Sequence, residues 1–199
     1  MSESNYSSVN RTVIKNTVAG ITAMLFLLPI PGLAEELASG LRVGQHANQF
    51  LVKDCTGPAA GKTLCYYCRY ADRPVIALFV REISDDIANL VGRIDRAVSS
   101  HEKERLAAFV VFVGKDTPEA EAQLKRLAKR QRLRNTPLTI YRESPQKLAD
   151  LYRINPDAAV TALVWQERRI TVNRAYPASQ LSRTQVRDFL KAAESSLKP

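Results

Sequence analysis

Apolar patterns typical of strands and apolar patterns typical of helices alternate along this chain, and their order predicts the fold. Continuous apolar runs and period-two alternation are both typical of β-strands. They predict strands over residues 50–54, 75–80, 106–113, 137–141, 159–165 and 170–176. The last two strands are joined by the polar residues 166–169, which predicts a β-hairpin.

Helical patterns separate these strands. After Ser84, apolar residues recur at three- and four-residue spacing as far as Val98, which predicts a helix with one buried face. N-cap residues and capping boxes mark where helices begin. Four such starts are present: Ser84, Thr117-Pro118, Ser144-Pro145 and Ser182-Arg183-Thr184-Gln185.

This order of elements predicts an α/β fold. Alternating strands and helices form a central sheet that is covered by helices on both faces. The C-terminal β-hairpin adds antiparallel strands, so the sheet is expected to be mixed. A last helix follows the hairpin. That layout is typical of a thioredoxin fold.

Residues 1–34 read as a signal peptide. Arg11 and Lys15 form a basic start, residues 18–28 are apolar, and small residues precede a predicted cleavage site after Ala34. The apolar stretch is shorter than a membrane span, although an uncleaved amphipathic anchor is an alternative. We therefore expect a secreted or periplasmic protein without a stable membrane span, consisting of a single domain over residues 35–199.

Positive charge is concentrated in one predicted helix. The chain carries a net charge of +9, and the segment from Lys125 to Arg134 holds six basic residues and no acidic one. Two interpretations of this basic helix remain open: a solvated helix face, or a surface that contacts anionic partners. It lacks the interleaved aromatic residues and the motifs of nucleic-acid readers, so no nucleic-acid partner is expected.

The candidate chemistry lies in Cys65-Tyr66-Tyr67-Cys68, just before the strand at residues 75–80. A Cys-x-x-Cys pair can form a redox disulfide or supply half of a metal site. The third cysteine, Cys55, lies in the same short window. In an oxidising compartment we expect two of the three cysteines to be paired, and the sequence leaves open which two.

Several segments, taken in order, resemble the thioredoxin-like superfamily, and its exported, peroxiredoxin-related branch in particular. The cysteine-and-tyrosine motif also resembles small secreted thioredoxin-like proteins. The resemblance extends from about Val43 to Leu190 and implies the same central strand and closing hairpin. It is carried by Val43-Gly44, Phe50, Asp54 and residues 61–64, 73–79 and 148–154.

The resemblance also shows where this chain departs from the family. The family's reactive Cys-x-x-Cys follows the central strand, where Ser84 and Ile87 stand in this chain. The family's cis-proline corresponds to Val160-Thr161, so a trans peptide bond is expected there. Peroxide reduction is not predicted. Cys65 and Cys68 precede the central strand and are expected near its other end.

Two functional hypotheses therefore remain. In the first, Cys65 attacks the disulfide of a protein substrate and Cys68 resolves the mixed disulfide, with Lys62, Arg69 and Arg73 favouring the thiolate. Tyr66 and Tyr67 would then form a partly exposed apolar lip. In the second, the protein is a non-catalytic binding module with a thioredoxin fold. Its disulfide staples a loop, and its basic helix or the edge of a pocket is the contact surface.

A metal site is a third possibility, and a weaker one. His46 with the three cysteines forms a possible zinc set, but the spacing is not that of a standard finger. An oxidising compartment also favours a disulfide over thiolate ligands. No metal and no cofactor are predicted.

Overall fold

The computed structural model describes residues 37–197, and the order of its elements confirms the predicted α/β fold. The predicted signal peptide lies outside the described residues. The strands are β1 (Val52–Asp54), β2 (Thr63–Leu64), β3 (Val75–Val80), β4 (Ala107–Phe112), β5 (Leu138–Tyr141), β6 (Val160–Gln166) and β7 (Arg169–Tyr176). The helices are α1 (Tyr66–Tyr70), α2 (Asp85–Ser100), α3 (Pro118–Gln131), α4 (Pro145–Tyr152) and α5 (Arg183–Ser196), with a 3-10 turn at Ala178–Gln180.

One mixed sheet contains all seven of these strands, in the order β2-β1-β5-β4-β3-β6-β7. Strands β3, β4 and β5 are parallel to one another, whereas β1 and β6 run antiparallel to their neighbours β5 and β3. Strands β6 and β7 form the predicted hairpin. The central position of β3 explains its unbroken apolar sequence, because both of its faces are buried.

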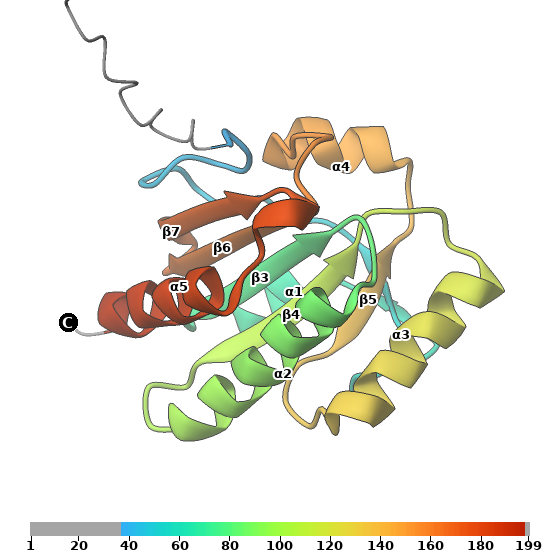
Figure 1. Ribbon diagram of the computed structural model, residues 1–199, viewed down its shortest axis with the longest axis horizontal. Helices are drawn as coiled ribbons and strands as arrows, with labels where there is room; N and C mark the ends of the chain where they lie inside the picture. Colours follow the sequence, from blue (N-terminus) through green and yellow to red (C-terminus); the bar gives the residue numbers. More distant parts are fainter. Residues whose placement is uncertain (1–36, 198–199) are drawn as a thin grey trace, which may run out of the picture. The chain divides into compact units, whose positions relative to one another are not determined.

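Helices cover both faces of the sheet (Figure 1). On one face, the side chains of Ile76, Leu78 and Val80 belong to a core that includes residues of α2, α3 and α5. On the other face, Val75, Ala77 and Phe79 pack in a second core with residues of α1 and α4. Alternate residues of β3 therefore bind the two layers together.

The predicted helix starts are confirmed. The side-chain oxygens of Ser84, Thr117, Ser144 and Ser182 each accept a hydrogen bond from the backbone N–H three residues later. In α3 the apolar residues Leu124 and Leu127 are buried, and the basic residues of the helix point outward. Lys125 forms an ion pair with Glu121, and Arg130 forms one with Asp85.

The first predicted strand is too long by two residues. Strand β1 begins at Val52, because Phe50 leaves the sheet and inserts its ring into the second core. The ring centroid of Phe50 lies 5.2 Å from that of Tyr152 and 6.0 Å from that of Phe79. Among the described residues, no helix has the length and apolar character needed to span a membrane.

Candidate functional site

A disulfide joins Cys65 and Cys68 at the start of helix α1. Cys65 is the N-cap residue of this helix, and its Sγ accepts a hydrogen bond of 3.0 Å from the backbone N–H of Cys68. Cys68 is exposed, whereas Cys65 is half-buried. The structure thus brings together the two cysteines that were the predicted site residues.

Two tyrosines on the inner face of α1 fasten the helix to the sheet. Tyr66 is 1% exposed, and its ring stacks on Phe109 of β4 with 5.4 Å between the centroids. The hydroxyl of Tyr70 donates a hydrogen bond of 3.3 Å to the carbonyl oxygen of Ala108. Burial raises the pKa of Tyr70 to about 12 and also raises the pKa of Tyr66. Both phenols therefore stay protonated and act as donors.

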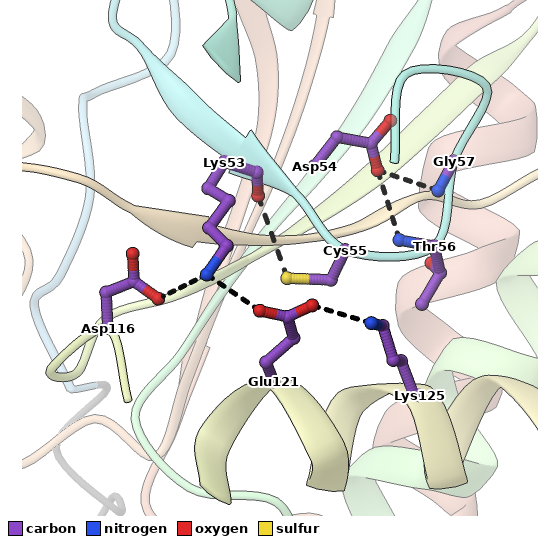
Figure 2. A network of polar contacts seen from close by, with 8 residues as sticks. All are labelled: Lys53, Asp54, Cys55, Thr56, Gly57, Asp116, Glu121 and Lys125. Carbon is purple, nitrogen blue, oxygen red and sulfur yellow. Dashed lines mark hydrogen bonds and ion pairs between the residues drawn. The ribbon is translucent and has the colours of Figure 1, made fainter. Parts of the chain in front are cut away.

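Asp54 anchors α1 at the edge of the sheet. Its buried carboxylate accepts a hydrogen bond of 2.9 Å from the hydroxyl of Tyr66. It also accepts hydrogen bonds from the backbone N–H groups of Thr56, Gly57 and Ala59, the first two of which are drawn in Figure 2. One carboxylate therefore holds both the loop after β1 and the helix that carries the cysteines.

The expected apolar lip of Tyr66 and Tyr67 is not formed, because Tyr66 points into the core. Only Tyr67 borders the surface, where its ring lies 6.5 Å from that of Trp165. The guanidinium of Arg168, from the β6–β7 turn, lies 5.1 Å from the centroid of the Tyr67 ring. The β6–β7 hairpin thus contacts α1 through the Tyr67 side chain.

Arg73 does not direct its charge toward the cysteines as expected. Its guanidinium donates hydrogen bonds to the carbonyl oxygens of Arg105 and Leu106, at 2.7 and 3.2 Å. It also lies 5.3 Å from the centroid of the Tyr70 ring. These contacts fix the C-terminal side of α1 next to the start of β4.

Cys55 is a free, buried thiol outside the disulfide. Its Sγ lies 3.8 Å from the carbonyl oxygen of Lys53, beside a network of ion pairs that joins Lys53, Asp116, Glu121 and Lys125 (Figure 2). Burial, and to a lesser extent the charge of Glu121, raises the pKa of Cys55 to about 12. The alternative bridges from Cys55 to Cys65 or Cys68 are therefore not the ones formed.

The possible zinc set is not assembled within residues 37–197. No group of three or more histidine, cysteine or acidic side chains gathers there in a way that could hold a metal ion. His46 instead forms an isolated β-bridge with Arg169. Two of the four suggested ligands are joined in the disulfide and a third is buried.

The position at which the thioredoxin-like family carries its cysteines is structural in this chain. The Ser84 Oγ accepts a hydrogen bond of 3.3 Å from the N–H of Ile87, and the Ile87 side chain is buried. The peptide bonds of residues 37–197, including the one before Val160, are all trans. The hydroxyl of Thr161 is buried and forms a 2.6 Å hydrogen bond with Ser39, which covers this region.

Helix α1 and Ser84 lie near different ends of β3. Ser84 follows the last residue of the strand, Val80, whereas Tyr67 contacts Trp165, which pairs with the first residue, Val75. Helix α2, which begins after Ser84, also packs in a different core from α1: α2 lies on one face of the sheet and α1 on the other. The disulfide therefore does not take the place of the family's usual cysteines.

Comparisons with solved structures agree with the resemblance seen in the sequence. The chain is similar to a yeast mitochondrial 1-Cys peroxiredoxin, at 14% identity and a TM-score of 0.59 over 78% of this chain and 76% of that chain. It is also similar to the thioredoxin domain of a thiol-disulfide oxidoreductase from Bacteroides vulgatus, at 11% identity and a TM-score of 0.56 over 75% and 99% of the two chains. A peroxidoxin from Mycobacterium tuberculosis matches at 12% identity and a TM-score of 0.58, over 80% and 99%.

The chain therefore has a thioredoxin-like fold, as its element order and sheet topology also require. Its neighbours in fold include both peroxiredoxins and thiol–disulfide oxidoreductases. No family model and no curated protein matches the sequence. The disulfide at α1 was predicted as a candidate from its spacing, whereas the anchoring roles of Asp54 and Tyr66 were not predicted.

Proposed function

We propose that the protein exchanges disulfides with protein substrates through Cys65 and Cys68. The observation that carries this proposal is the disulfide itself, which spans the first turn of α1 and leaves Cys68 exposed. The fold supports it, because thiol–disulfide oxidoreductases are among the similar structures.

A structural role explains this disulfide poorly. The two cysteines are separated by three positions and lie in one helical turn, so the bond ties α1 to no other element. In the chain-entropy model, closing so short a loop stabilises a fold by about 2 kcal/mol, against about 4.7 kcal/mol for a 100-residue loop. Tyr66 and Tyr70 already attach the helix to the sheet through hydrogen bonds and ring contacts.

The geometry supports different roles for the two sulfurs. In the disulfide form the N–H of Cys68 points at the Cys65 Sγ, and after reduction this donor favours the Cys65 thiolate. The Cys65 thiolate attacks one sulfur of a substrate disulfide, and the other sulfur leaves as a thiolate that takes a proton from water. Cys68 then attacks the Cys65 Sγ, which releases the second substrate thiol and re-forms the Cys65–Cys68 bond. Two electrons pass from the protein to the substrate.

The reduction potential of the pair tests this function. We expect a potential above about −300 mV, where disulfides are labile, together with turnover in an insulin reduction assay. Cys65→Ser should abolish turnover, and Cys55→Ser, which removes the buried thiol, should keep it. A potential well below that value without turnover would identify a non-catalytic binding module with an inert disulfide.

Trapping experiments test the two roles. Cys68→Ser should accumulate a mixed disulfide between Cys65 and the substrate, because the resolving thiol is missing. Cys65→Ser should accumulate much less, since it lacks the capped thiolate. The opposite pattern would reverse the assignment while keeping the exchange activity.

We further propose that the protein is exported and that its signal peptide is removed after Ala34. The support is the pattern of residues 1–34, and an oxidising compartment suits a formed disulfide. The intact mass of the protein recovered from the periplasm of a bacterial host should correspond to a chain that begins at Glu35. Ala34→Asp, with a charge at the cleavage position, should leave the precursor uncut. A full-length mass for the unmodified chain would refute cleavage.

A further inference from the structure

A cavity of about 460 Å³ lies between the C-terminal side of α1, the loop after β1 and the chain that follows α3. The charged side chains that line it are Arg69, Arg73 and Arg134, and no aspartate or glutamate lines it. Three guanidinium groups around one hollow repel one another unless a negative charge lies between them.

The three arginines differ in how they are held. The guanidinium of Arg73 is fixed by two backbone carbonyl oxygens and by the Tyr70 ring. Arg69 and Arg134 are exposed, and within residues 37–197 neither has an ion-pair partner. Their donors are therefore available to a ligand.

The backbone donors of the cavity wall are already used. Asp95 accepts hydrogen bonds from the N–H groups of Arg134, Asn135 and Thr136, at distances between 2.8 and 3.2 Å. On the opposite wall, the N–H groups of Thr56 and Gly57 point toward Asp54 (Figure 2). Two buried carboxylates thus satisfy the amides of both walls and leave the side chains free for another anion.

We propose that this cavity binds the oxyanion group of a small ligand, either a phosphate or a carboxylate. Arg69 and Arg134 donate charge-assisted hydrogen bonds to it, and Arg73 adds a fixed positive charge. Guanidinium groups suit both anions, because their planar donor pairs match two oxygens at once. The site does not depend on the redox role of the cysteines.

This site differs from the predicted contact of the basic helix with anionic surfaces. Lys125 and Arg130, on the outer face of that helix, already pair with acidic residues. Arg134 lies beyond the last helical residue, Gln131, and lines the cavity.

Calorimetric titration of the oxidised full-length protein tests the proposal. Inorganic phosphate and citrate are titrated separately, in a chloride background of constant ionic strength. We expect one bound anion per chain, and the tighter of the two identifies the ligand as phosphorylated or as a carboxylate. Saturable binding of neither anion would overturn the proposal.

Matched variants distinguish specific anion binding in the cavity from the non-specific attraction of anions to the net positive charge of the protein. Arg69→Gln/Arg134→Gln should weaken binding by at least about tenfold, because two charge-assisted donors are lost. Lys129→Gln/Arg142→Gln removes the same charge from exposed positions outside the cavity and should leave the affinity within about twofold. Equal losses in the two double variants would overturn the proposal.

Discussion

The hydroxyl of Tyr66 donates a hydrogen bond of 2.9 Å to the carboxylate of Asp54, and both groups are buried. Tyr66 lies between the two cysteines in the sequence, and Asp54 is the last residue of β1. This bond therefore connects the candidate redox site directly to the sheet.

Tyr66→Phe should destabilise the protein by about 1–3 kcal/mol, because a buried carboxylate oxygen loses a donor. The free energy of unfolding in urea measures the loss. Tyr67→Phe is the matched control, since the Tyr67 ring borders the surface and its hydroxyl contributes none of these bonds. Equal stabilities of the two variants would show that the bond to Asp54 contributes little.

Gly57→Ala should also destabilise the protein. A Cβ atom at Gly57 would lie 2.5 Å from the Tyr66 hydroxyl oxygen, 2.7 Å from the Asp54 carboxylate and 2.7 Å from the Pro137 Cβ. Overpacking of this kind costs about 1–3 kcal/mol. In a double-mutant cycle, Gly57→Ala should cost less in the Tyr66→Phe background, because the shortest of these contacts is removed. Additive effects would argue that the strain falls on Asp54 and Pro137 and not on the Tyr66 hydroxyl.

Stability at acid pH should depend on Glu121. Hydrogen bonds from Lys125 and Lys53 lower the pKa of this carboxyl group from 4.5 to about 2 in the folded protein. Its contribution is complete above the pKa of the unfolded chain and is lost as the pH falls toward 2. Glu121→Gln should therefore reduce the free energy of unfolding near pH 6, and the difference from the unmodified protein should vanish near pH 2.

Urea unfolding between pH 2 and pH 7 measures this difference. Glu119→Gln is the control, because Glu119 lies on the same helix but is exposed and outside the ion-pair network of Glu121. A constant gap between the Glu121→Gln variant and the unmodified protein across this range would contradict the assigned pKa.

Cys55 should resist alkylation in the folded protein. With its pKa raised to about 12, roughly one thiol in ten thousand is ionised at pH 8, and the side chain is buried as well. After mild reduction, iodoacetamide should label Cys65 and Cys68 but reach Cys55 only in denaturant. Mass spectrometry of the peptides distinguishes the three sites. Rapid labelling of Cys55 in the folded state would show that its region opens.

The fold was predictable from the sequence because its signals are local. The apolar run of β3, the N-cap at Ser84 and the capping box at Ser182 each act within a few residues. Strand β1 was predicted less well, since Phe50 continues the alternation of the strand while its ring packs in the core. The alternation of apolar and polar residues indicates which side chains are buried. It does not indicate whether the backbone forms hydrogen bonds with a neighbouring strand.

The candidate site was predictable only in part, because its geometry depends on distant residues. The spacing of Cys65 and Cys68 indicated a pair, and the structure shows that pair as a disulfide. The burial of Tyr66 depends on Asp54 and Phe109, and no local pattern records either contact. The same holds for the arginine-lined cavity, whose residues come from three separate segments.

Helix α1 spans five residues, which is too short to persist by itself in water. Its supports come from both sides of it in the chain, from Asp54 before it and from Trp165 and Arg168 long after it. The native geometry of the cysteine pair therefore relies on contacts with residues far from it in the chain, and the few residues of α1 do not hold it by themselves.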